Sequence, residues 1–150
     1  MHFRYKTTAL FLAVVFLFSV DRFLKAAALA GVNKPIFGDF LSFAFSRNFG
    51  IAFSLPFSGW PLLIVVGLIV VVLGHFGFKA FLAQDFYRLS AYGLVIAGAG
   101  SNLFDRVKYG FVIDYLDVAY FSILNAADVM IFCGVVWLLF LSYKKGPITE

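Results

Sequence analysis

The amino-acid sequence predicts an all-α membrane protein in which four transmembrane helices carry a small extracytoplasmic β-hairpin or sheet. Of the 150 residues, 63% are hydrophobic, 20% are aromatic and only 13% are charged. A water-soluble domain of this size has no interior large enough to bury so much apolar surface, so we expect the chain to use a bilayer as its solvent. A chain of this length predicts one integral-membrane domain, over residues 1–150.

Four apolar runs approach the roughly 20 residues that a helix needs to cross a bilayer. They cover about residues 7–30, 60–78, 89–104 and 124–143. The third run is short and polar at its end, and it is rich in glycine, alanine and serine. Small residues let helix backbones approach closely in lipid, where packing drives association, so this run predicts a helix-packing face.

Lysine and arginine predict that both chain ends face the cytoplasm. Six basic and two acidic residues flank one side of the spans: Arg4, Lys6, Lys79, Arg88, Lys144, Lys145, Asp85 and Glu150. The other six acidic residues lie on the opposite side, balanced there by six basic ones. Since cytoplasmic loops carry the excess of Lys and Arg, the first side is the inner one. The acids therefore gather at the outer face, which is the first indication of function.

The first apolar run also matches another interpretation, a cleaved signal peptide. It has a basic start, an apolar middle and the small-x-small pattern at Ala28–Ala30. Three charged residues, Asp21, Arg22 and Lys25, separate the apolar middle from that pattern and favour a retained span. Asp21 and Lys25 are four residues apart, so they share a helix face and can pair. Such a pair would orient the helix or support chemistry nearby.

The segment between the first two spans, residues 36–58, predicts a β-rich outer loop. Leucine and phenylalanine alternate with small or polar residues along 41–46, and the alternation resumes at 51–53 after Asn48-Phe49-Gly50. Period-two alternation around an Asn/Gly turn predicts a short β-hairpin. One of its faces would be apolar enough to lie on the membrane surface.

Polar residues cluster after the third span. Asn102 and Arg106 are four residues apart, with Asp105 beside them. Arg106 would anchor the helix end at the lipid headgroups, as basic residues near span ends commonly do, or it would belong to a polar pocket with its neighbours. The sequence does not separate these two interpretations.

Two aspartates suggest chemistry at the outer face. Asp114 stands alone between apolar residues, where loss of hydration favours a raised pKa. Asp128 has a local explanation, because Asn125 at a helix N-cap and an acid three residues later form a typical capping pair. That explanation does not extend to Asp114. One ionised and one protonated carboxylate can together activate a water for attack on an amide carbonyl, so the pair predicts an aspartic peptidase site.

Two other functional classes compete with a peptidase. Intramembrane acids also serve proton-coupled carriers, but these need acids near mid-membrane, and the second span has none. A divalent-metal enzyme acting on lipid headgroups would use four acids as oxygen ligands, Asp105, Asp114, Asp117 and Asp128. An HExxH motif is absent, and one cysteine and two histidines leave little for other metal or nucleophilic chemistry. No metal, cofactor or nucleic-acid partner is predicted.

Five motifs, in this order, resemble those of one family, the lipoprotein signal peptidases (signal peptidase II) of bacteria. They are DRFLK at 21–25, NFGIAFS at 48–54, GAGSNLFDR at 98–106, GFVIDY at 110–115 and LNAAD at 124–128. The resemblance implies a membrane-embedded aspartyl protease with four transmembrane helices and a small outer β-sheet. It implies a location in the bacterial cytoplasmic (inner) membrane, with the active site at the outer face.

The resemblance also implies roles and partners. It makes Asp114 and Asp128 the catalytic pair, and it gives binding or supporting roles to Asn48, Asn102, Arg106, Asn125, Asp21 and Lys25. Implied partners are lipid-modified prolipoproteins, cut just before the diacylglyceryl-cysteine, membrane lipids, and globomycin-type cyclic peptides as inhibitors. The chain departs from the family at Arg22, Ser101 and Leu124, where glutamine, glycine and phenylalanine are usual. Serine and leucine would preserve the local packing, whereas Arg22 adds a charge near the site and could change substrate preference.

Overall fold

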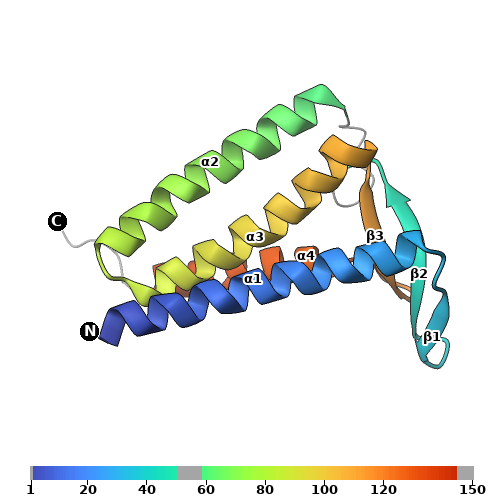
Figure 1. Cartoon of the computed structure of the whole chain (residues 1–150), viewed down its shortest axis with the longest axis horizontal. Helices are drawn as coiled ribbons and strands as arrows, with labels where there is room; N and C mark the ends of the chain where they lie inside the picture. Colours follow the sequence, from blue (N-terminus) through green and yellow to red (C-terminus); the bar gives the residue numbers. More distant parts are fainter. Residues whose placement is uncertain (1, 51–58, 145–150) are drawn as a thin grey trace.

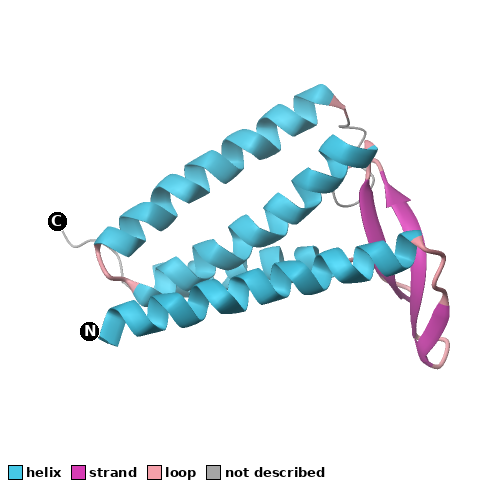
Figure 2. Ribbon diagram, in the orientation of Figure 1, coloured by secondary structure: helices cyan, strands magenta, loops and turns pink. Residues whose placement is uncertain are grey.

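The computed structural model describes residues 2–50 and 59–144. Within these ranges it has the helices α1 (His2–Leu29), α2 (Trp60–Leu82), α3 (Phe86–Tyr109) and α4 (Ala126–Tyr143). Its strands are β1 (Lys34–Phe37), β2 (Leu41–Asn48), β3 (Val112–Val118) and β4 (Ser122–Leu124). The helices extend between two ends of the molecule, and the sheet lies across one of these ends (Figures 1 and 2).

Three of the described helices, α1, α2 and α4, are long and apolar enough to cross a membrane. The predicted third span forms the 24-residue helix α3, which is not among these candidates. The difference arises because α3 carries buried polar side chains, including Ser101, Asn102 and Asp105, at the end near the sheet. It packs against each of the other three helices and is the centre of the bundle (Figure 1). A fourth span and the orientation of the chain remain predictions.

Close packing of α3 on α4 confirms the predicted role of the small residues. A side-chain carbon at Gly98 would collide with the backbone carbonyl of Ala127. One at Gly134 would lie 2.5 Å from a methyl group of Val95 and 2.8 Å from the carbonyl oxygen of Ala91. Both glycines therefore allow the two backbones to touch. This contact brings the start of α4 against the polar end of α3.

The sheet is antiparallel and larger than the predicted hairpin, with the order β1-β2-β3-β4. The prediction of a strand before Asn48 is confirmed as β2, but its described partners are β1 and β3. The second strand predicted for the hairpin, at 51–53, lies outside the described residues. Asn48 is the last residue of β2, and its side-chain oxygen accepts a hydrogen bond from the N–H of Gly50 at 3.2 Å, as in an Asx turn.

The alternation predicted along β2 is interrupted. Phe43 is buried, whereas Phe45, which was expected on the same face, is 36% exposed. The register between β2 and β3 shifts between Phe43 and Ser46, so one extra residue enters β2 at a bulge and later side chains change face. After the bulge, Ser46 lies opposite Asp114.

A small apolar core joins the sheet to the end of α1. It consists of Ala28, Phe43, Ile113 and Tyr115. The rings of Phe43 and Tyr115 have centroids 5.3 Å apart. Because this core fixes β3 against α1, it also fixes Asp114, which follows Ile113 on the strand.

Candidate active site

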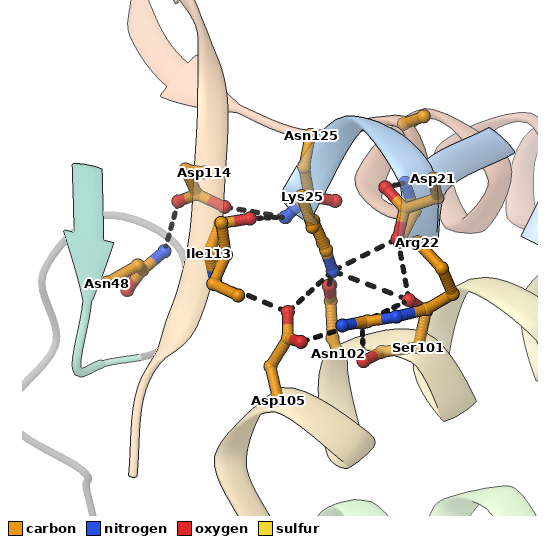
Figure 3. A network of polar contacts seen from close by, with 12 residues as sticks. Asp21, Arg22, Lys25, Asn48, Ser101, Asn102, Asp105, Ile113, Asp114 and Asn125 are labelled. Carbon is orange, nitrogen blue, oxygen red and sulfur yellow. Dashed lines mark hydrogen bonds and ion pairs between the residues drawn. The ribbon is translucent and has the colours of Figure 1, made fainter. Parts of the chain in front are cut away.

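Asp114 lies on β3 with only 2% of its surface exposed. Its carboxylate accepts hydrogen bonds from two side-chain amides, those of Asn48 at 3.0 Å and Asn125 at 2.5 Å (Figure 3). Burial raises the pKa of Asp114 to about 6, against a partly opposing effect of the Asn48 hydrogen bond. The expectation of a raised pKa at this position is therefore confirmed. A buried carboxyl of this kind can hold a proton near neutral pH.

Asp128 occupies the first turn of α4, three residues after the N-cap Asn125. The two residues form a complete capping box: the N–H of Asp128 donates to Asn125 Oδ1 at 2.9 Å, and the N–H of Asn125 donates to Asp128 Oδ2 at 3.2 Å. The other carboxylate oxygen accepts from the amide of Asn102 at 2.8 Å. The predicted capping pair is present, and the Asn102 contact is additional to it.

Asn125 connects the two aspartates. Its side-chain amide donates to Asp114, and also to the carbonyl of Ile113 at 3.3 Å, while its side-chain oxygen and backbone N–H bind Asp128. The residue is completely buried. Both carboxylates thus bind one residue, Asp114 through the Asn125 side-chain amide and Asp128 through its backbone N–H. Their negative charges are close enough for Asp128 to raise the pKa of Asp114.

A buried charge cluster lies behind Asp128. Lys25 Nζ is 3.1 Å from Asp21 and 2.8 Å from Asp105, and it donates to the side-chain oxygen of Asn102 at 2.8 Å (Figure 3). The predicted Asp21–Lys25 pair is present, and both side chains are fully buried. Since Asn102 accepts from Lys25 and donates to Asp128, it links the ammonium group to the first turn of α4.

Arg22 belongs to the same cluster. Its Nη1 contacts Asp105 at 2.6 Å and donates to the hydroxyl of Ser101 at 3.0 Å. Arg22 and Ser101, which come from different helices, therefore contact each other. The cluster then holds two acidic and two basic side chains, which balance in charge.

Arg106 lies nearer the end of β2. Its Nη2 donates to the carbonyl of Gly50 at 2.7 Å. The negative charges of three carboxylates, those of Asp105, Asp114 and Asp128, favour the positive charge of its guanidinium group. Of the two interpretations left open by the sequence, this contact favours the polar pocket over a headgroup anchor.

Sequence comparison agrees with the motifs. A profile of the family described as Signal peptidase (SPase) II matches residues 13–144. The lipoprotein signal peptidase of Caldicellulosiruptor bescii is 35% identical over 133 residues, covering 86% of this chain and 87% of the relative. That of Syntrophomonas wolfei is 36% identical over 145 residues, covering 93% and 94%. The chain belongs to the signal peptidase II family.

Solved structures agree in fold with this signal peptidase II family member. A bacterial membrane enzyme solved by the in meso method at 2.3 Å resolution aligns with a TM-score of 0.80 at 24% identity, covering 95% of this chain and 92% of that one. A second such structure, at 1.9 Å, aligns with a TM-score of 0.73 at 25% identity, covering 89% and 92%. Membership in a peptidase family confirms the predicted class of activity and gives the carrier alternative no support.

The metal alternative also finds no geometric support. In residues 2–50 and 59–144, no three His, Cys, Asp or Glu side chains group as ligands for one ion. Asp105, which that alternative required, faces Lys25 and Arg22 instead of Asp114.

Sequence analysis named Asp105 and Ser101 but did not predict their contacts with Arg22 and Asp21 in this signal peptidase II family member. It missed Tyr115, whose hydroxyl donates to Asp21 at 2.9 Å. One signal was available, because Ser101 and Asp105 are four residues apart on one face of α3, as Asp21 and Lys25 are on α1. For Tyr115 the sequence offers no comparable spacing.

Proposed function

We propose that this signal peptidase II family member removes the signal peptide from lipid-modified prolipoproteins by cutting just before the diacylglyceryl-cysteine, with Asp114 and Asp128 as its catalytic residues. The observation that carries this assignment is the attachment of both carboxylates to Asn125. A buried and a half-buried carboxylate that bind the same residue, one through its side-chain amide and one through its backbone N–H, match the chemical requirement of an aspartic peptidase, one group ionised and one protonated.

The surroundings of the two groups differ and suggest their roles. Asp128 accepts hydrogen bonds at a helix N-terminus, where the helix dipole favours an anion, and its Asn102 partner is polarised by the Lys25 ammonium group. Asp114 lies on a strand, and its hydrogen-bond donors within residues 2–50 and 59–144 are two neutral side-chain amides, while burial raises its pKa to about 6. We therefore assign the negative charge to Asp128 and the proton to Asp114.

These roles give a balanced hydrolysis. Asp128 takes a proton from a water molecule as the water oxygen attacks the scissile carbonyl, and the Asp114 hydroxyl donates a hydrogen bond to the carbonyl oxygen. The tetrahedral intermediate then collapses, the C–N bond breaks, and a proton returns from the pair to the leaving nitrogen. The new carboxyl ends the signal peptide, and the cysteine keeps the new amino group. No metal or cofactor enters these steps.

Asn48 and Arg106 are proposed to position the substrate backbone. Both lie where β2 ends: Asn48 holds Asp114, and Arg106 holds the Gly50 carbonyl. Supporting roles are proposed for the residues that hold the two aspartates in place. Asn125 and Asn102 bind them directly, and Lys25 binds Asn102 and pairs with Asp21.

The proposed location is the bacterial cytoplasmic membrane, with both chain ends inside and the site at the outer face. Three candidate spans and the inner excess of basic residues support this orientation. The acyl chains of a lipidated cysteine would hold the scissile bond at headgroup depth, and the sheet lies at one end of the helices (Figure 2), where we propose that it meets that bond. Exposed aromatic side chains on and beside the sheet, such as Phe37 at the end of β1 and Phe121 in the turn before β4, suit contact with membrane lipids. Globomycin-type cyclic peptides are proposed as inhibitors that occupy the same site.

The direct test uses purified protein with two versions of one precursor, one carrying a diacylglyceryl-cysteine and one unmodified. We expect cleavage of the lipidated form immediately before the cysteine, unaffected by a metal chelator, and no cleavage of the unmodified form. Equal cleavage of both would contradict the proposed substrate class, and loss of activity with the chelator would restore the metal alternative.

A further inference from the structure

The start of α4 is capped by residues from two other elements as well as by its own capping box. A helix leaves its first four backbone N–H groups without partners inside the helix. In α4 the N-cap and third positions, Asn125 and Asp128, satisfy each other. The N–H of Ala126 donates to the Tyr115 hydroxyl at 2.9 Å, and that of Ala127 donates to Asp21 Oδ1 at 3.2 Å.

Tyr115 and Asp21 also bind each other. The Tyr115 hydroxyl donates to Asp21 Oδ1 at 2.9 Å, the same oxygen that receives the Ala127 N–H. The second oxygen of Asp21 accepts from the Ser101 hydroxyl at 2.6 Å and faces Lys25 at 3.1 Å. One carboxylate of α1 thus connects the buried charge cluster to the first turn of α4.

The Tyr115 hydroxyl is held in place by burial of the side chain and by packing of its ring. The side chain has no exposed surface, and its ring packs on Phe43. Burial, and the negative charge of Asp21, raise the pKa of Tyr115, so the phenol keeps its proton and always donates to Asp21 while accepting from Ala126. The hydroxyl is therefore always the donor toward Asp21 and always the acceptor toward Ala126.

We propose that Tyr115 is a positioning residue for the reaction, acting through Asp21 and the first turn of α4 to fix the carboxylate of Asp128. Tyr115 directly follows Asp114 on β3, and the backbone N–H that it binds is two residues before Asp128. The hydroxyl therefore sets the place of the α4 turn relative to the strand that carries Asp114. This proposal rests on the function proposed above for the two aspartates.

The test compares the variant Tyr115→Phe with the wild-type protein. Phenylalanine keeps the ring packed on Phe43 but leaves the Ala126 N–H without its acceptor. We expect hydrogen exchange at the start of α4 to become about 5- to 30-fold faster, the factor expected from loss of a helix cap. We expect kcat for the lipidated precursor to fall about 10- to 100-fold, the loss that small displacements of catalytic groups cause, with KM unchanged.

One variant serves as the control. Tyr109→Phe removes a hydroxyl from a tyrosine packed beside the same apolar core, and that hydroxyl has no hydrogen bond among the described residues. Exchange and kcat should therefore stay at wild-type values in Tyr109→Phe.

Each outcome decides the proposal. Unchanged exchange in Tyr115→Phe, or faster exchange with kcat at the wild-type value, would overturn it. If the variant does not accumulate, exchange of the wild-type protein decides, because Ala126 and Ala127 should be protected as strongly as the middle of α4. Exchange is measured without substrate, so it tests the hydrogen bonds at the start of α4 independently of cleavage. Failure of the wild type to cut the lipidated precursor would overturn the proposed function and would not affect the exchange result.

Discussion

Replacing Asn48 by alanine should move the alkaline limb of the pH–rate profile upward. The Asn48 amide donates to the carboxylate of Asp114 at 3.0 Å and stabilises its ionised form. Loss of that bond makes ionisation harder, so the pKa of Asp114 rises from its value of about 6. Because the proposed mechanism needs Asp114 protonated, activity falls as pH rises through this pKa, and a higher pKa extends activity to higher pH.

The expected displacement follows from the energy of the bond. A hydrogen bond to a charged group contributes about 1.5–3 kcal/mol, and one pKa unit corresponds to about 1.4 kcal/mol. The midpoint of the alkaline limb in kcat/KM should therefore rise by about 1–2 pH units in Asn48→Ala. Asn48 is also proposed to bind substrate, so the absolute rate should fall while the midpoint moves upward.

The assay is cleavage of a lipidated precursor across pH 5–9, with kcat/KM measured at each pH. The matched control is Asn33→Ala, which changes an exposed asparagine outside the site and should leave the midpoint where it is in the wild type. A midpoint in Asn48→Ala that stays unchanged or moves downward would refute the assignment of the proton to Asp114.

Three further variants test the supporting structure. Lys25→Met should destabilise the protein by about 3–5 kcal/mol in thermal or denaturant unfolding, because it leaves the buried Asp21 and Asp105 without their shared cation; a loss below 1 kcal/mol would contradict the cluster. Gly134→Ala should cost about 1–3 kcal/mol by forcing α3 and α4 apart, whereas Gly67→Ala, where a side-chain carbon meets nothing, should be neutral in the same measurement. Asp117→Asn should retain most of the cleavage rate, since this side chain is half-buried at the strand end; complete inactivity would mean that the wrong acid was assigned.

Local features of the site could be predicted from the sequence. The capping box of Asn125 and Asp128 and the pair of Asp21 and Lys25 depend on spacings of three and four residues within one helix, which a sequence displays directly. The small residues of α3 predicted its packing face for a similar reason, since the collisions at Gly98 follow from residue size.

Long-range features could not be predicted in the same way. The pairing of Arg22 with Asp105 joins residues 83 positions apart, and no local spacing encodes it. The pairing of β2 with β3, and the bulge that exposes Phe45, depend on a strand contributed by a distant segment. Hydropathy also gives no account of the buried polar side chains of α3. One of them, Asn102, forms hydrogen bonds with side chains of α1 and α4, which a hydropathy pattern does not encode.

The most direct test of the central claim is the cleavage rate of a diacylglyceryl-modified precursor by Asp114→Asn and by Asp128→Asn, each purified from membranes. Asparagine keeps the size of either side chain but can neither accept the proton of the attacking water nor supply one to the leaving nitrogen. We predict that each variant accumulates and folds like the wild type and that neither gives detectable cleavage. Processing at the wild-type rate by either variant would contradict the assignment of Asp114 and Asp128 as the catalytic pair.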